Sequence, residues 1–170
     1  MNIIIAEPHH LAMLSTFAAK TFYDSWQEFN TEEDMQLFVM QHFTPEIISR
    51  EIDDASQIFL LAMNQQTLAG YLKLKIGKPL KYDLTGTCFE IEKLYVDKDL
   101  QNQQTGTLLL KDADREANER KADTLWLSVW KPNERAIKFY ERNGFSVFGE
   151  QEFILGKDVQ YDFLMRKDLV

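Results

Sequence analysis

The chain has 170 residues, with 27 Asp and Glu against 19 Lys and Arg, which gives a formal net charge of −8. Hydrophobic residues make up 45 % of the sequence and aromatic residues 12 %, a composition typical of a folded globular protein and unlike that of a disordered one. The acidic balance argues against sequence-independent nucleic-acid binding, which needs clustered Lys and Arg, and is compatible with a cationic partner. We expect a single domain over residues 1–170.

The sequence also bears on the cellular setting. No apolar run approaches the ~20 residues that a membrane-spanning helix needs. No basic segment precedes Ile3-Ile4-Ile5, so this run is interpreted as a first strand rather than as part of a signal peptide. Cys88 is the only cysteine, which excludes an internal disulfide and a cysteine-rich metal site and favours a reducing compartment. We therefore expect a cytoplasmic protein with no membrane partner.

Helical spacing dominates the first third of the chain. Apolar residues between His10 and Phe22 recur at helical intervals. The run Asn30-Thr31-Glu32-Glu33 resembles a capping box that opens a second helix, and Thr44-Pro45 begins a third with proline at its first position. The second helix should run to about residue 43 and place its apolar residues on one core-facing side. These residues are Met35, Phe38, Val39 and Phe43.

Strands dominate the rest of the chain. Their order after the helices, βββ, α, β, α, ββ, predicts a mixed sheet covered by helices. The strand–helix–strand unit from Phe89 to Val129 should be a parallel crossover. The expected strands are Ile58–Met63, Leu68–Ile76, Phe89–Val96, Leu125–Trp130, Phe145–Phe148 and Gln160–Arg166, and the expected helices are Thr105–Arg120 and Asn133–Arg142.

The segment from Leu94 to Leu109 is the most informative for function. A strand ends there, a short polar loop turns, and a helix begins at about Thr105. Free backbone amides at a helix N-terminus bind anions, and the small residue Gly106 would let a phosphate approach the backbone. Such amides need no net positive charge, which suits an acidic protein. The alternative is an ordinary strand-to-helix turn in which Gly106 serves packing.

A second motif lies about one strand–helix unit downstream. The pattern Asn133-x-x-Ala136-x-x-Phe139-Tyr140-x-x-x-Gly144-Phe145 resembles the C-terminal signature of the GNAT superfamily of N-acetyltransferases. The upstream segment Leu94-Tyr95-Val96, followed by Gln101-x-x-Gln104-x-Gly106, is similar to the acetyl-CoA loop of that superfamily. Gln104 departs from the family pattern, which has glycine at this position, and this departure bears on the affinity for CoA.

The resemblance implies an α/β (α+β) fold of the GNAT type, a mixed, mostly antiparallel seven-stranded sheet with splayed central strands, flanked by helices. It also implies acetyl-CoA as cosubstrate, with the pyrophosphate held by backbone amides and no metal. The positions that it assigns to the cofactor are Leu94, Tyr95, Val96, Gln101, Asn102, Gln103, Gln104, Thr105, Gly106, Thr107, Asn133, Arg135 and Tyr140.

Acyl transfer from a thioester to an amine needs a proton donor for the thiolate and an acceptor for the proton of the amine. Tyr140 matches the family position that protonates the thiolate, and its alternative role is that of a packed core tyrosine. Glu90 and Glu92 alternate with their neighbours and so share one strand face. Either could be the base, both could bind a cationic amine, or both could be solvated surface acids.

The N-terminal half adds a hint about the acceptor. Three segments, Thr21–Trp26, Asn30–Met35 and Gly70–Leu74, are similar to PaiA-like bacterial enzymes, which acetylate spermidine and spermine. The resemblance therefore implies a small amine as partner, with a polyamine as the first choice, and is compatible with a homodimer. The alternatives are acetylation of a protein N-terminus or another small amine, and a CoA-binding regulatory protein without catalysis.

Overall fold

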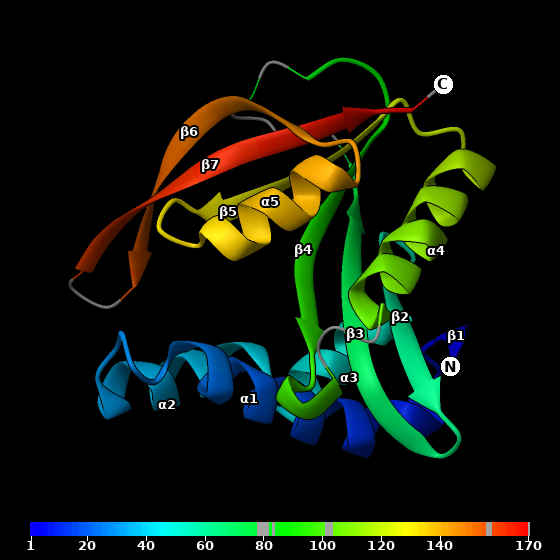
Figure 1. Cartoon of the computed structure of the whole chain (residues 1–170). Helices are drawn as coiled ribbons and strands as arrows, with labels where there is room; N and C mark the ends of the chain where they lie inside the picture. The colour runs from blue at the N-terminus through cyan, green and yellow to red at the C-terminus, as the bar shows by residue number, and fades with distance from the viewer. Residues whose placement is uncertain (78–81, 83, 101–103, 156–157, 170) are drawn as a thin grey trace. The chain divides into compact units, whose positions relative to one another are not determined.

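The structure is a computed structural model and describes residues 1–77, 82, 84–100, 104–155 and 158–169. These residues form a seven-stranded mixed sheet in the order β1-β2-β3-β4-β5-β7-β6, accompanied by helices (Figure 1). The chain falls into two compact units, Met1–Lys73 with Lys93–Asp112, and Leu74–Glu92 with Ala113–Val170. The expected fold class is confirmed.

The elements follow the order expected from the sequence. The strands are β1 (Asn2–Ile5), β2 (Gln57–Asn64), β3 (Thr67–Ile76), β4 (Cys88–Val96), β5 (Thr124–Trp130), β6 (Ser146–Leu155) and β7 (Asp158–Asp168). The α-helices are α1 (Leu11–Trp26), α2 (Glu32–His42), α3 (Pro45–Asp53), α4 (Thr105–Glu119) and α5 (Glu134–Arg142), and short 3₁₀ turns span η1 (Pro8–His10) and η2 (Lys98–Leu100).

The first unit is built around one apolar cluster. Leu14, Ala18 and Phe22, spaced at four residues, line the buried side of α1 and pack with Met35 and with Phe43. The stacked rings of Phe22 and Phe38, whose centroids lie 4.4 Å apart, belong to the same cluster. The predicted core-facing side of the second helix is therefore confirmed.

The start of α2 differs in detail from the expected capping box. The N-cap residue is Thr31, whose side-chain oxygen accepts a hydrogen bond from the Asp34 backbone N–H at 3.2 Å. Asn30 instead turns back and donates through Nδ2 to the Trp26 carbonyl at 2.9 Å. The polar run thus satisfies groups at the end of one helix and at the start of the next, because both termini leave backbone groups without intrahelical partners.

The second unit contains the predicted parallel crossover. Cys88 to Glu90 of β4 pair in parallel with Thr124 to Trp126 of β5, and this register ends there although both strands continue. On its other side β5 pairs antiparallel with β7 along its whole length. The crossover therefore places the first half of β4, with Glu90, beside β5.

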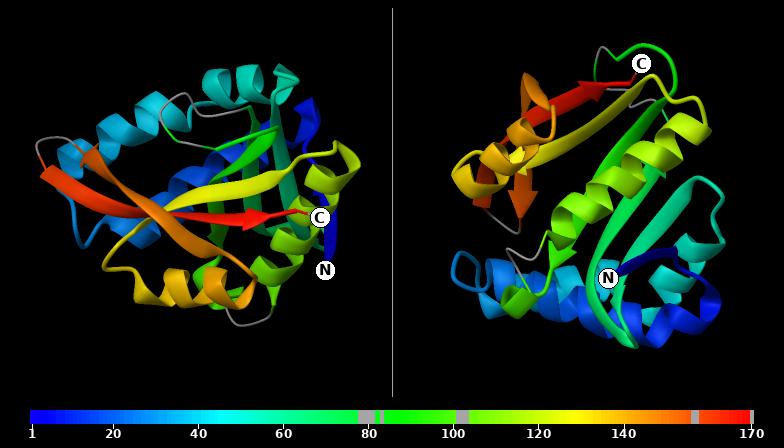
Figure 2. Two further views of the ribbon diagram at one scale, coloured as in Figure 1. Left: turned by 90° about the horizontal axis from the view of Figure 1, so that it is seen from above. Right: turned by 45° about the vertical axis from the view of Figure 1, so that its right-hand side comes forward.

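The hairpin of β6 and β7 is longer than the sequence pattern predicts. Its strands twist about each other (Figure 2), with a register shift between Val147 and Gly149. The polar run Gly149–Glu152 does not alternate with apolar residues, so the pattern ends the strand too early. Charged residues are common on such edge strands because they oppose pairing with other chains.

Two hydrogen bonds between Thr87 and Asp123, which we call the latch, hold the start of the crossover next to Gly86. The Thr87 backbone N–H donates to Asp123 Oδ2 at 2.7 Å, and the Asp123 N–H donates to the Thr87 carbonyl at 2.8 Å. Gly86 has φ +75°, and a Cβ atom added there would clash with Asp123 Oδ2. The latch thus requires glycine both for the left-handed backbone and for the close carboxylate.

We predict that Gly86→Ala lowers the free energy of unfolding by about 2–3 kcal/mol, from left-handed strain of about 1–2 kcal/mol and displacement of the Asp123 carboxylate. In an Asp123→Ala background the carboxylate is gone and the left-handed strain remains, so the same change should cost about 1–2 kcal/mol. Denaturant titration of the four proteins measures this difference. Equal costs in both backgrounds would contradict the latch.

Within the part of the chain that the structure describes, no helix is long and apolar enough to cross a membrane.

Candidate active site

The first turn of α4 presents backbone donors that the helix does not use. The Gln104 carbonyl accepts from the Leu108 N–H at 2.9 Å, so the N–H groups of Thr105, Gly106 and Thr107 precede the first intrahelical bond. The Thr105 side chain is 1 % exposed, and its Oγ1 has no hydrogen-bond partner among the described residues. Free amides, a hydroxyl and the helix dipole are the groups with which helix N-termini bind anions.

Gln104 adopts the backbone conformation for which glycine is suited. Its φ is +62°, in the left-handed region that costs a residue with a Cβ roughly 1–2 kcal/mol. Its side chain is exposed. The sequence predicted a departure from the family pattern at this position, and the structure gives the physical reason why glycine fits there.

Gly70 of β3 permits a close approach beneath the same turn. A Cβ atom at Gly70 would lie 2.9 Å from the Tyr95 carbonyl oxygen, 3.2 Å from Val96 Cγ2 and 3.3 Å from Thr105 Cγ2. The absence of a side chain therefore lets the end of β4 and the first residue of α4 lie against β3. The sequence singled out Gly70 only as part of a subfamily motif, so this role was missed.

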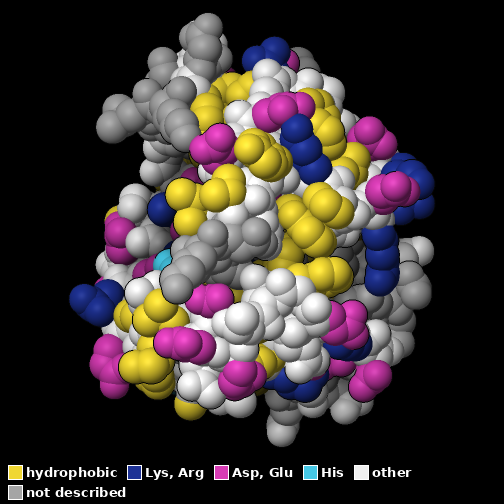
Figure 3. All heavy atoms as spheres, turned by 90° about the vertical axis from the view of Figure 1, so that its left-hand side faces the viewer, with side chains coloured by type: hydrophobic (Ala, Val, Ile, Leu, Met, Phe, Trp, Pro, Cys, Tyr) yellow, Lys and Arg dark blue, Asp and Glu magenta, His cyan; other side chains and the backbone are white. Residues whose placement is uncertain are grey.

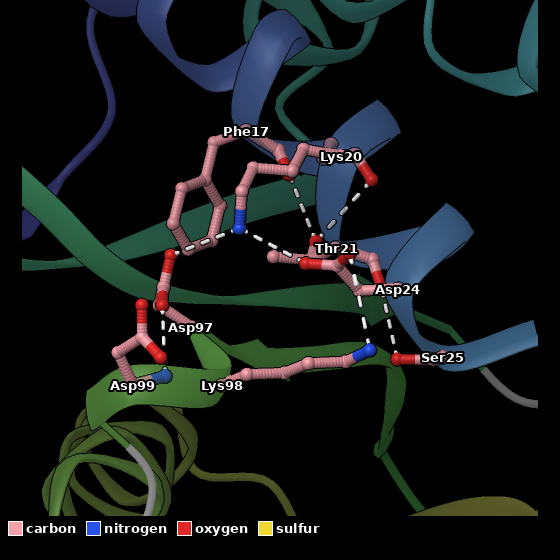
Figure 4. A network of polar contacts seen from close by, with 9 residues as sticks. Phe17, Lys20, Thr21, Asp24, Ser25, Asp97, Lys98 and Asp99 are labelled. Atoms are coloured by element: carbon pink, nitrogen blue, oxygen red, sulfur yellow. Dashed lines mark hydrogen bonds and ion pairs between the residues drawn. The ribbon is translucent and has the colours of Figure 1, made fainter.

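Charged residues hold the loop between β4 and α4 to α1 (Figure 4). Lys20 donates to Asp24 Oδ2 at 2.9 Å and to Asp97 Oδ2 at 3.2 Å. Asp97 also accepts from the Asp99 backbone N–H at 3.0 Å, and its own N–H donates to the Ala69 carbonyl at 2.9 Å. The loop is thus tied both to α1 and to β3 as it leaves the sheet.

The pKa shifts of Asp97 and Lys20 favour the charged form of both side chains at neutral pH. The pKa of the Asp97 carboxyl is lowered, chiefly because the Asp99 N–H stabilises the carboxylate and secondarily because Lys20 lies beside it. The pKa of Lys20 is raised, mainly by its hydrogen bond to Asp24. Asp97 therefore stabilises the fold above its unfolded-state pKa, and this stabilisation is lost as the pH falls through the lowered value.

The side chain of Tyr95 belongs to the interior of the first unit. Its hydroxyl accepts a hydrogen bond from Trp26 Nε1 at 3.1 Å, and its ring stacks on Tyr71 with centroids 5.8 Å apart. Burial raises the pKa of this phenol. Tyr95 can therefore offer a cofactor its backbone but not its hydroxyl, and Trp26 serves to hold Tyr95.

The downstream motif has a structural explanation at most of its positions. Asn133 caps α5 by accepting a hydrogen bond from the Ala136 N–H at 3.1 Å. Gly144 has φ +91° and follows the helix, where the Phe145 N–H donates to the Tyr140 carbonyl at 3.1 Å. Tyr140 is 9 % exposed and packs edge to face against Phe139 and Phe145. Neither capping nor helix termination requires its hydroxyl.

Glu90 and Glu92 lie where the strand alternation predicts. Both are half-buried and alternate with buried Phe89 and Ile91. A Glu92 oxygen lies 3.5 Å from Lys75 Nζ, so this carboxylate takes part in an ion pair with the neighbouring strand. The two acids therefore share a strand face, as the alternation predicts.

Three of the expected cofactor positions, Gln101, Asn102 and Gln103, lie outside the described residues. Among the residues that are described, no cluster of three or more His, Cys, Asp or Glu side chains could hold a metal ion. Lys20, Asp97 and Gly70 are parts of the site region that sequence reasoning missed. The Asp97-x-Asp99 spacing was a usable signal, because aspartate side chains accept from backbone N–H groups two residues on.

Comparison with known proteins identifies relatives of the whole chain. Residues 16–145 match the acetyltransferase (GNAT) family. An uncharacterized N-acetyltransferase of Lactobacillus delbrueckii subsp. lactis is 31 % identical over 100 % of this chain and 98 % of its own length. One from Mycobacterium tuberculosis is 26 % identical over 92 % of this chain and 96 % of its own length.

Solved structures share the fold. The PaiA N-acetyltransferase from Thermoplasma acidophilum, crystallised with coenzyme A, superposes with a TM-score of 0.78 at 23 % identity, covering 99 % of both chains. The strand order, the two sequence motifs and the family match agree with one another. The chain therefore belongs to the GNAT family of acetyltransferases.

Proposed function

We propose that the protein transfers the acetyl group of acetyl-CoA to a primary amine of a polyamine such as spermidine or spermine, by direct attack in a ternary complex. The observation that carries the proposal is the first turn of α4, whose free amides and buried Thr105 hydroxyl suit a pyrophosphate. The coenzyme A bound to the PaiA N-acetyltransferase of Thermoplasma acidophilum supports this choice of donor.

We assign the cosubstrate to the positions that carry the family pattern. The amides of Thr105, Gly106 and Thr107 would bind the pyrophosphate, since backbone donors need no cationic side chain. The end of β4, Leu94 to Val96, would pair through its backbone with the pantetheine arm. Asn133 caps α5 through Oδ1, so its contribution to the cosubstrate would come from the amide nitrogen; Arg135 completes the proposed set.

Tyr140 is the proposed general acid. A phenol with a pKa near 10 is protonated at neutral pH and can donate to the departing thiolate of CoA. The rings of Phe139 and Phe145 pack edge to face against the Tyr140 ring. These contacts support a catalytic role because a proton donor must be held in place before the thiolate forms.

Glu90 is the proposed proton acceptor, directly or through a water molecule. Glu92, the second candidate, lies 3.5 Å from Lys75 Nζ, whereas Glu90 lies in the parallel register beside β5. The base and the acid would act in succession within one ternary complex. The amine nitrogen attacks the thioester carbonyl and loses its proton, and the C–S bond then breaks as Tyr140 protonates the sulfur.

The charge of the protein supports a cationic acceptor. Acidic side chains are spread over the face in Figure 3, and the first turn of α2 carries Glu32, Glu33 and Asp34. A net charge of −8 attracts a polycation over long range. A neutral or anionic acceptor would gain nothing from this field.

Replacing Tyr140 with Phe should lower kcat by about 10²–10⁴-fold, the usual contribution of general-acid catalysis, and leave the Kd of CoA unchanged. Steady-state kinetics and calorimetry measure the two quantities. Tyr161→Phe on β7, where the tyrosine is exposed, is the matched control and should match the wild type. An unchanged kcat in the Tyr140 variant would remove this residue from the mechanism.

Gly106→Val should weaken CoA binding by more than about tenfold, because a β-branched side chain would occupy the place of the phosphate. Gln104→Gly should leave the fold intact, since glycine adopts the left-handed backbone without the cost of a Cβ atom. Calorimetric titration with CoA tests both variants, with circular dichroism as the control for folding. Wild-type affinity in a folded Gly106→Val protein would contradict the placement of the phosphate.

The acceptor is tested with purified protein, acetyl-CoA and a panel of amines, by following release of the CoA thiol. Spermidine and spermine should be acetylated, with a KM that rises with salt as the Debye length falls from about 10 Å at 0.1 M to about 3 Å at 1 M. A peptide N-terminus and an aminoglycoside serve as competing acceptors. The polyamine proposal fails if these are acetylated while spermidine and spermine are inert.

A further inference from the structure

A buried carboxylate in the second unit is left unused by the mechanism above. Asp162 of β7 is 7 % exposed and accepts side-chain hydrogen bonds from Gln151 of β6 and Ser128 of β5. The Gln151 side-chain oxygen in turn accepts from the Tyr82 hydroxyl. These partners are all neutral, and Ser128 itself is exposed, so the network runs from the interior to the surface.

The sheet register places this network on the same face as the proposed base. Asp162 pairs with Trp130 of β5, and Glu90 of β4 pairs with Trp126 of the same strand. Paired residues point to one side of a sheet, as do residues two apart along a strand, so Glu90 and Asp162 share a face. The charges of both carboxylates raise the pKa of Tyr82, after the larger effect of burial, which indicates that both lie within electrostatic reach of its hydroxyl.

Within the described part of the chain, Asp162 has no cationic partner. The cation on the same face of β7, Arg166, lies over the Phe148 ring at 5.8 Å and 3.7 Å from Asp168. Buried carboxylates are normally paired with a cation or have a function, because desolvation of an isolated charge is costly.

The same face holds a buried indole N–H whose hydrogen-bonding capacity is not used by the described residues. Trp126 is 5 % exposed, and its indole N–H finds no acceptor among the described residues. The Trp126 ring meets Tyr82 edge to face, with centroids 5.4 Å apart. The face therefore combines an uncompensated carboxylate, an unused donor and aromatic walls, which together suit an organic cation.

We propose that Asp162 binds the distal ammonium of the acceptor, the amine that stays protonated while another amine of the same molecule attacks acetyl-CoA. The attacking nitrogen must be neutral, whereas the remaining amines of a polyamine, with pKa values near 10, are charged at neutral pH. A carboxylate without a cation of its own gains most from binding such a group. The inference rests on the proposed function and adds a specificity residue to it.

The melting temperature of an Asp162 variant distinguishes a binding role of this carboxylate from a structural one. Burial raises the pKa of Asp162, so ionisation at neutral pH opposes folding, and this cost is present above the raised pKa. Asp162→Asn keeps the shape and removes the charge. A binding role predicts an equal or higher Tm together with weaker acceptor binding, whereas a structural role predicts a lower Tm.

The test compares wild type and Asp162→Asn with spermidine and with butylamine, which has the attacking amine but no second charge. For spermidine, the variant should show a KM raised by about tenfold or more, and calorimetry on the CoA-loaded protein should show the same loss of spermidine affinity. For butylamine, KM and kcat should change by less than about threefold, which is the size of effect that a substitution outside the binding contacts usually has. Asp168→Asn, an exposed carboxylate on the same strand, should leave all constants at wild-type values.

The outcomes distinguish this inference from the proposed function. If spermidine is acetylated with the same KM by both proteins, Asp162 is not the anchor, while the polyamine activity stands. If wild type binds spermidine through Asp162 without acetylating it, the anchor stands and the proposed activity fails. If wild type neither binds nor acetylates spermidine, the proposed role of Asp162 is overturned. It is also overturned if KM rises by the same factor for spermidine and for butylamine in the variant.

Discussion

The start of α4 leaves backbone N–H groups that no carbonyl of the helix can accept, and the surrounding first unit is arranged around that turn. Gly70 has no side chain, which lets Thr105 lie against β3 and the end of β4. Asp97 is tied to Lys20 and to the Ala69 carbonyl, so the loop leaves the sheet in a fixed direction. A helix dipole and aligned amides become a useful anion site only when such contacts hold them before the ligand arrives.

In the second unit, the structure accounts for most positions of the downstream motif through folding. Asn133 and Gly144 are accounted for by the cap and the left-handed termination of α5. Tyr140 is buried between the rings of Phe139 and Phe145, and its role as general acid is part of the proposal. The latch between Thr87 and Asp123 fixes the start of β4 against β5, and the residues that follow on β4 include both candidate bases.

Much of the fold could be predicted from sequence because its elements carry clear periodic signals. The buried side of α2 and the parallel crossover followed from apolar spacing and element order. The hairpin of β6 and β7 was underestimated because the polar residues from Gly149 to Glu152 interrupt the alternation. The role of Gly70 depends on a contact between strands and a helix far apart in sequence, which local patterns do not encode.

The burial of Asp162 could not be predicted from the sequence, because it also depends on contacts between strands. A single aspartate in a strand pattern is normally interpreted as a solvent-exposed residue. Only the pairing of β7 with β5 and β6 shows that Asp162 is buried beside neutral hydrogen-bond donors. The structure thus places a carboxylate of β7 in the interior, with its pKa raised by burial. Natural proteins retain such costs where binding or catalysis depends on them.

The central claim is that the first turn of α4 binds the phosphates of CoA through its backbone. The most direct measurement is a titration of ¹⁵N-labelled protein with CoA, followed by amide chemical shifts. The account predicts large, saturable shifts at the N–H groups of Thr105, Gly106 and Thr107, with smaller changes along the rest of α4. Saturable CoA binding that leaves these three amides unshifted would contradict it.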